Sequence, residues 1–244
     1  MRRVLKRLAI GLVVLLVLAT LGFLGWTRIA RYPAFDSAST LAAEAEVERG
    51  WHVFEPAGDP IAGFIFYPGG LVDPAAYAPL MQRLADAGVL AVVVPMPLDL
   101  AVFDSGAARD VIDAYPAIDR WALGGHSLGG AMAAEFASAH PEAIDGLVFL
   151  ASYPAESTDL SALDAPALSI YGTEDGVAGD VFADSLERLP AATELLVLEG
   201  GNHAQFGDYG PQEGDGEATM SREEQQQRTA EAIVGLAETI AEAR

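Results

Sequence analysis

Residues 121–136 read WALGGHSLGGAMAAEF, and this stretch decides the fold that the rest of the sequence predicts. An apolar strand over 120–124 turns at Gly125-His126-Ser127-Leu128-Gly129 into a helix over 128–140. A G-x-S-x-G motif at a strand-to-helix turn is typical of a serine held in a strained backbone conformation, facing a helix N-terminus that favours negative charge. We therefore interpret Ser127 as a candidate nucleophile; the alternative is a plain tight turn.

Strand-like and helical segments alternate on both sides of this motif. The run at 89–94 (VLAVVV) is apolar on both faces, as a central parallel strand is. The alternation predicts an α/β fold with a mostly parallel sheet and helices on both faces, and it excludes a helical bundle. In such sheets functional groups follow the carboxyl ends of the strands. The expected strands are 46–55, 61–67, 89–94, 120–124, 146–151, 167–171 and 194–198, and the expected helices are 75–87, 107–115, 128–140 and 221–243.

The N-terminal segment has the composition of a transmembrane helix. Residues 8–27 carry no charge, and a helix of this length spans roughly 30 Å, the thickness of a bilayer core. Basic residues before it favour a cytoplasmic N-terminus. We predict a membrane anchor over 1–31, a small-residue tether over 32–45, and a catalytic domain over 46–244 on the outer side of the cell membrane.

The alternative for this segment is a signal peptide that is cleaved, so that the protein is secreted. A signal peptide has a shorter apolar region, roughly 7–15 residues, followed by small residues at the cleavage site. Here the apolar run is longer, and Arg28 and Arg31 follow it. These two features favour the uncleaved anchor.

Composition excludes several classes of chemistry. The 244 residues include no cysteine, which excludes disulfides, thiolate metal sites and a cysteine nucleophile. The formal net charge of −21 argues against a nucleic-acid partner. The oligomeric state is left open by the sequence.

A serine nucleophile needs a base, and the chain has four histidines. His203 lies in a Gly-Gly-Asn-His loop directly after the strand at 194–198, which favours it as the base. His52 lies on an early edge strand, and His140 lies at a helix end before a proline. His126, inside the serine motif, is interpreted as a packing or pocket-wall residue.

The orienting acid is expected in the loop after the strand at 167–171, which reads Gly172-Thr173-Glu174-Asp175-Gly176. Asp175 is favoured over Glu174 because its position before a glycine suits a turn. Asp180 is a third option and is more typical of a helix cap. This loop ends the penultimate strand, where an acid can orient the base.

An oxyanion hole needs two backbone N–H groups. Leu128, the residue after the serine, supplies one. The loop after the strand at 61–67 supplies the other, and Pro68 in this loop has no N–H. The remaining candidates are Gly69, Gly70 and Leu71, and Gly70 is the first choice.

Three residues near these loops are predicted to contact substrate: Tyr67, Leu71 and His126. The acidic stretch 208–217 could bind Ca²⁺ through oxygen ligands, but it does not match an EF-hand, and a solvated loop bordering the site is favoured. We expect no metal and no organic cofactor, and a small acyl compound as the substrate.

Four segments together resemble the α/β-hydrolase superfamily: YPGGLVDPAAYAPL, GGHSLGGAMA, SIYGTEDG and GGNHAQFGDYG. They are most similar to the "α/β-hydrolase fold-5" group, which is related to dienelactone hydrolases, over about residues 46–243. The resemblance implies a hydrolase of esters or similar acyl compounds, with the chain order Ser127, Asp175, His203. Dienelactone hydrolases use a cysteine nucleophile, which this chain lacks, so their lactone substrate is not implied.

Two other functions stay open at this stage: a catalytically silent scaffold used for binding, and a peptidase or haloperoxidase on the same fold. The segment at 152–166 is too short to hold a helical cap over the site. We therefore predict an esterase for small soluble acyl groups, with little or no cap, instead of a lipase activated at lipid surfaces.

Overall fold

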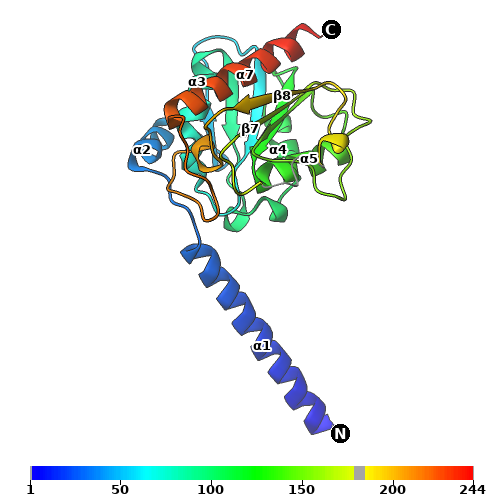
Figure 1. The fold of residues 1–244 in the computed structure, drawn as a ribbon. Helices are drawn as coiled ribbons and strands as arrows, with labels where there is room; N and C mark the ends of the chain where they lie inside the picture. Colours follow the sequence, from blue (N-terminus) through cyan, green and yellow to red (C-terminus); the bar gives the residue numbers. More distant parts are fainter. Residues whose placement is uncertain (1, 179–184, 244) are drawn as a thin grey trace. The chain divides into compact units, whose positions relative to one another are not determined.

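One long helix makes up the N-terminal unit of the chain. The computed structural model describes residues 2–178 and 185–243, and it divides the chain into two compact units, Met1–Arg31 and Tyr32–Arg244. Helix α1 spans Arg2–Ile29 (Figure 1). Its segment Leu5–Ile29, with a mean hydropathy of 2.7, is long and apolar enough to cross a membrane, and a signal sequence has the same properties.

The second unit is built on a mostly parallel sheet. In the described residues the sheet has eight strands in the order β1-β2-β4-β3-β5-β6-β7-β8. β1 and β2 form a hairpin that pairs antiparallel with β4, and all the other pairs are parallel. The predicted α/β fold is confirmed. The strands are Glu46–Glu48 (β1), Trp51–Phe54 (β2), Ala62–Tyr67 (β3), Val89–Val93 (β4), Trp121–His126 (β5), Gly146–Leu150 (β6), Ala167–Gly172 (β7) and Thr193–Leu198 (β8).

Helices cover both faces of this sheet, because its central strands are apolar on both sides. Helices α3 (Ala78–Asp86) and α7 (Arg222–Glu242) share one hydrophobic cluster with the sheet. Helices α4 (Ala108–Ala114) and α5 (Leu128–Ala139) belong to a second cluster on the opposite face (Figure 1).

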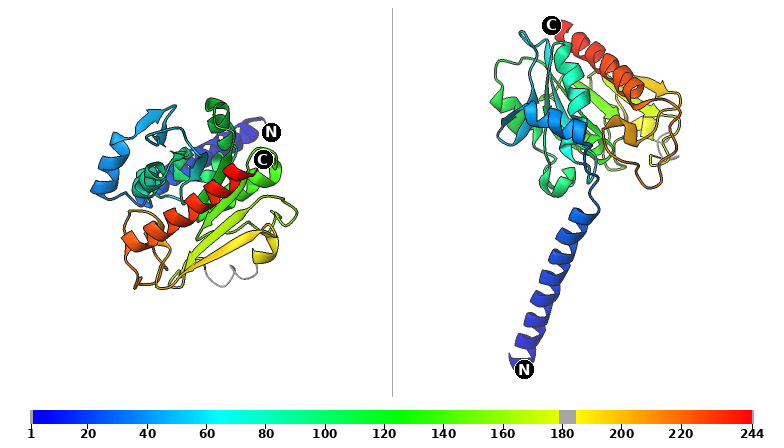
Figure 2. Two further views of the ribbon diagram at one scale, coloured as in Figure 1. Left: turned by 90° about the horizontal axis from the view of Figure 1, so that it is seen from above. Right: turned by 90° about the vertical axis from the view of Figure 1, so that its left-hand side faces the viewer.

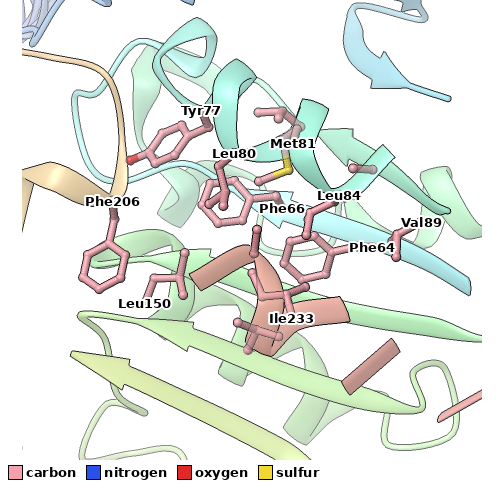
Figure 3. Close-up of a cluster of buried hydrophobic side chains, with 14 of the residues drawn as sticks. Phe64, Phe66, Tyr77, Leu80, Met81, Leu84, Val89, Leu150, Phe206 and Ile233 are labelled. Carbon is pink, nitrogen blue, oxygen red and sulfur yellow. The ribbon is translucent and has the colours of Figure 1, made fainter. Parts of the chain in front are cut away.

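Alternation along β3 divides its side chains between the two clusters. Phe64 and Phe66 point to the cluster of α3 and α7, where they pack among Leu80, Met81 and Ile233 (Figure 3). Ile65 and Tyr67 belong to the cluster on the other face. Burying one such side chain contributes about 1.5–3 kcal/mol, so this strand is held firmly from both sides.

The predicted tether over 32–45 is wrong. Residues Asp36–Glu44 form helix α2, which lies beside α3 (Figure 2). Ala38 and Ala42, four residues apart and therefore on one helix face, are 0% and 2% exposed. This narrow stripe of alanines allows a close approach to the domain, so the segment is part of the second unit.

The segment between β6 and β7 carries no cap. Residues 152–166 form turns and irregular structure without a helix. This agrees with the prediction of a minimal cap, and it leaves the carboxyl ends of β5, β6 and β7 without a helical cover from this segment.

Candidate active site

Ser127 lies in a strained backbone conformation between β5 and α5, as the motif predicts. Its φ of 52° and ψ of −122° are unusual for a residue with a side chain. Glycines make the turn possible: a Cβ at Gly125 would lie 2.4 Å from the carbonyl carbon of Gly129. A Cβ at Gly129 would lie 2.1 Å from the carbonyl oxygen of Tyr67. The serine carbonyl also accepts a 2.6 Å hydrogen bond from Ser152 Oγ, which steadies the turn.

Asp175 and His203 form a buried pair. His203 Nδ1 lies 3.1 Å and 3.0 Å from the two carboxylate oxygens of Asp175, and the side chains are 1% (His203) and 3% (Asp175) exposed. The amides of Val177 and Ala178 each donate to the same carboxylate at 2.9 Å. An ionised carboxylate only accepts, so Nδ1 carries the proton and Nε2 of a neutral imidazole is left as an acceptor.

His203 Nε2 is free to receive a proton. It is buried, and within the described part of the chain it has no hydrogen-bond partner. His203 and Ser127 line the same cavity of about 280 Å³. The candidate nucleophile, base and acid are therefore brought together, from the loops after β5, β8 and β7.

A second carboxylate, which the sequence did not single out, holds the loop of the base. Asp215 accepts hydrogen bonds from the amides of His203 at 3.0 Å and Ala204 at 2.8 Å. Asp215 belongs to the acidic stretch 208–217, whose oxygen ligands make it a candidate calcium site in the sequence. In residues 2–178 and 185–243, no group of three or more His, Cys, Asp or Glu side chains could hold a metal ion.

His126 connects the two sides of the site. The amide of Gly69 donates to Tyr77 Oη at 3.0 Å, and this hydroxyl lies 2.9 Å from His126 Nδ1. His126 Nε2 lies 3.1 Å from the carbonyl oxygen of His203, which can only accept. The imidazole is therefore protonated on Nε2 and accepts from Tyr77. Burial, together with the nearby His203 ring, holds the pKa of His126 well below its usual range, in agreement with a neutral ring.

Hydrogen bonding separates the three candidates for the second oxyanion donor. The amide of Gly69 is used by Tyr77, and the amide of Leu71 donates to Asp99 at 2.7 Å. The amide of Gly70 has no acceptor among the described residues. A Cβ at Gly70 would lie 3.1 Å from Leu128 Cδ2, so the two residues are in contact. Leu128 begins α5, where the first N–H groups have no partner within the helix.

The structure does not bring the predicted substrate contacts to the cavity. Tyr67 is fully buried; its hydroxyl donates to the carbonyl of Ser105 at 2.9 Å and accepts from the amide of Ala108 at 2.7 Å. Its position on β3 points the ring into the hydrophobic cluster on the face of the sheet that α4 and α5 cover. Leu71 and His126 are also outside the cavity lining, and both act through hydrogen bonds to other loops.

The remaining candidates are placed elsewhere. Glu174 is exposed, and its carboxylate lies 3.3 Å from Thr173 Oγ1. His52 and His140 do not line the cavity. Asp180 lies outside the described residues. The cavity walls are instead made by residues that follow β6 and β7 or begin α5, a position that strand ends could have indicated: Leu128, Ala131, Ala151, Ser152, Tyr153, Val177 and Ala178.

A mostly parallel sheet with a strained serine after β5, a carboxylate after β7 and a histidine after β8 defines the α/β class of hydrolases. The chain belongs to the alpha/beta hydrolase family, whose model matches residues 63–227. A comparison with curated protein sequences gave no match.

Solved structures of low sequence identity share the fold. Est1E from Butyrivibrio proteoclasticus has a TM-score of 0.58 at 13% identity, with 78% of this chain and 96% of that chain covered. The esterase domain of a Rhodothermus marinus protein has a TM-score of 0.57 at 14% identity, with coverages of 80% and 96%. A predicted CIB-like hydrolase from Thermoplasma acidophilum has a TM-score of 0.55 at 16% identity, with coverages of 78% and 96%.

Proposed function

We propose that this hydrolase cleaves carboxylic esters or related acyl compounds through a Ser127–His203–Asp175 triad. The observation that carries the proposal is the buried Asp175–His203 pair: His203 Nε2, which has no partner among the described residues, shares a cavity with the strained Ser127. The two esterase structures that share the fold support the same reaction class.

In the proposed reaction, Ser127 Oγ attacks the acyl carbonyl carbon while His203 Nε2 takes the hydroxyl proton. Asp175 holds the imidazole in the required tautomer and stabilises its charged form. The tetrahedral adduct expels the alcohol, which receives the proton from His203. Water then attacks the acyl-enzyme by the same proton transfers, which releases the acid and restores Ser127.

The amides of Leu128 and Gly70 are proposed to stabilise the oxyanion of the tetrahedral adduct. Both residues are in contact, and neither amide is used by another group in the described residues. Donors fixed by the fold stabilise developing charge without reorganisation, and losing one such donor typically costs about 10²–10³ in kcat.

The cavity favours small acyl groups. Its volume is about 280 Å³, and small side chains such as Ala131, Ala151 and Ala178 form part of its wall. Since residues 152–166 carry no cap helix, the site needs no lipid surface to open it. We expect simple saturation kinetics with short-chain soluble esters and no jump in rate when droplets or micelles form.

The N-terminal helix is proposed to be an uncleaved anchor that keeps the catalytic unit at the outer side of the cell membrane. Its uncharged run, residues 8–27, is longer than the apolar region of a signal peptide, and Arg28 and Arg31 follow this run. The full-length chain should remain with membranes through an alkaline carbonate wash. A mature form in the medium that starts near Tyr32 or Pro33 would indicate a cleaved signal peptide instead.

Two measurements test the enzymatic proposal. A fluorophosphonate probe should label the wild-type protein on Ser127 and leave the folded variant S127A unlabelled. A panel of acyl esters, amides and lactones then identifies the reaction class. Absence of labelling would favour a silent binding scaffold, and preferential amide cleavage would favour a peptidase.

A further inference from the structure

The four residues Tyr32–Phe35, here called the strap, lie between two loops of the candidate site. On one side the amide of Tyr32 donates to the carbonyl of Leu71 at 2.7 Å, and the amide of Asp73 donates to the carbonyl of Tyr32 at 3.0 Å. On the other side the amide of Phe35 donates to the carbonyl of Asp208 at 2.8 Å. β-bridges to Val72 and Tyr209 accompany these bonds.

The first of these loops carries the proposed oxyanion donor. Leu71, which follows Gly70 directly, has a φ of 60°, a conformation that costs a residue with a side chain about 1–3 kcal/mol. Such a conformation persists only where its surroundings hold it. Leu71 is held by the hydrogen bond that its amide donates to the carbonyl of Asp99 and by the hydrogen bond that its carbonyl accepts from the amide of Tyr32.

The second loop continues from the candidate base. The short helix η5 (Ala204–Phe206) follows His203, and Asp208 and Tyr209 come after it, beyond Gly207. Tyr209 is fully buried, and its ring centroid lies 5.8 Å from that of Tyr32. The strap therefore contacts this loop through both backbone and side chain.

Arg222 extends the connection on the same side. Its guanidinium lies 5.2 Å from the ring centroid of Phe35 and donates to the carbonyls of Ala204, Gly207 and Tyr209. The strap and Arg222 thus contact each other and the loop that follows His203, here called the base loop, although no strap residue lines the cavity.

We propose that the strap is a positioning element of the active site, which fixes the oxyanion loop relative to the base loop. The proposal rests on the proposed function. It makes Tyr32 and Phe35 positioning residues, which act on catalysis only through the two loops that they contact. The strap contributes no group to bound substrate, so its loss should lower kcat and leave KM nearly unchanged.

The backbone of Phe35 allows a clean test in the full-length chain. Its φ of −66° is the value that proline adopts, so F35P removes the amide that binds the carbonyl of Asp208, together with the ring, without forcing a new conformation. F35A removes only the ring that lies against Arg222. D36P is the matched control, because Asp36 is the first residue of α2, where proline is favoured.

We expect F35P to lower kcat roughly tenfold, as for the loss of one hydrogen bond, with KM changed less than about twofold. We expect F35A to lower kcat less and D36P to match wild type. Inhibition by a boronic acid, whose adduct resembles the tetrahedral intermediate, should weaken in proportion to kcat in F35P. A wild-type kcat in folded F35P would overturn the proposal and leave the strap a merely structural element.

Hydrogen exchange separates this proposal from the proposed function. The amide of Asp73, which binds Tyr32, should exchange faster in F35P than in D36P, because loosening one side of the strap should loosen the other. If the wild-type protein cleaves no ester, the proposed function falls, and faster exchange still supports the coupling. Equal exchange in the two variants would overturn the coupling whether or not esters are cleaved.

Discussion

The two halves of the candidate site are held in place by different forces. The oxyanion half, residues 67–70 together with Gly125, Leu128 and Gly129, acts through backbone amides, and its geometry is set by backbone packed against backbone at Gly125 and Gly129. The base half, which comprises Asp175, His203 and Asp215, acts through side chains, and hydrogen bonds orient them.

This difference predicts two kinds of failure. An atom added where backbone is closely packed can be accommodated only by displacing that backbone. A substitution at the packed glycines of the oxyanion half should therefore lower stability and activity together. Hydrogen bonds can be removed one at a time, so the base half should lose activity in steps while the fold persists.

The largest expected effect is that of G129A. The new Cβ would lie 2.1 Å from the carbonyl oxygen of Tyr67 and 2.4 Å from that of Pro68, neither of which can move freely. We expect loss of more than about 4 kcal/mol in the free energy of unfolding and loss of all ester turnover. Thermal melts and turnover assays measure the two. G106A is the control, because nothing lies within 4 Å of its Cβ. A stable, active G129A would end the proposed contrast.

D175N should separate activity from folding. Replacing the carboxylate that binds His203 Nδ1 favours the wrong tautomer and removes the charge that stabilises the imidazolium. We expect turnover to fall by about 10⁴, as in other triads, while the melting temperature stays near wild type. The exposed neighbour supplies the control E174Q, which should be fully active. An equal loss in E174Q would mean that the acid has been assigned to the wrong residue.

D215N should give a graded loss in the same half. An amide keeps only one acceptor oxygen, so one of the bonds to the amides of His203 and Ala204 is lost. We expect kcat to fall about tenfold with little change in KM, because hydrogen bonds to charged groups contribute about 1.5–3 kcal/mol. E213Q, at an exposed position two residues away, should be unaffected. Full activity in D215N would make the hydrogen bonds that Asp215 accepts dispensable for catalysis.

The smallest expected effect is a change in the pH dependence of stability. Because His126 has a lowered pKa in the folded protein, the unfolded chain takes up a proton below about pH 6.5 that the folded protein does not. Its contribution to stability is therefore complete above that pH and is lost as pH falls, by up to about 1.4 kcal/mol per unit. H126Q should flatten this slope between about pH 6.5 and 5 in denaturant titrations. A wild-type slope in H126Q would assign the titration to another group.

Much of the site could be predicted because its functional residues lie in local motifs at strand ends. Ser127 is marked by its flanking glycines, and His203 and Asp175 by the strands that precede them. The strand and helix segments were also predicted closely, since period and turn residues are local signals.

The residues that sequence analysis missed depend on contacts between distant segments. Tyr77 and Asp215 act through partners 49 and 12 residues away, His126 and His203 respectively, and no local pattern marks these pairs. The direction of the Tyr67 side chain depends on which helices cover each face of β3. Alternation along the strand does not specify this. The segment 32–45 is predicted as a tether because the residues of α2 that pack on the domain are alanines, which give no strong apolar pattern.

The contact of Gly129 with the carbonyls of Tyr67 and Pro68 has a consequence for how precisely the site is assembled. The end of β3 and the start of α5 touch without a side chain between them, so no rotamer change can widen or narrow the gap. The spacing between the end of β3 and the start of α5 is therefore set at Gly129 by contact between backbone atoms. Side-chain motion should therefore change this backbone spacing less than it changes the distances between side chains in the base half.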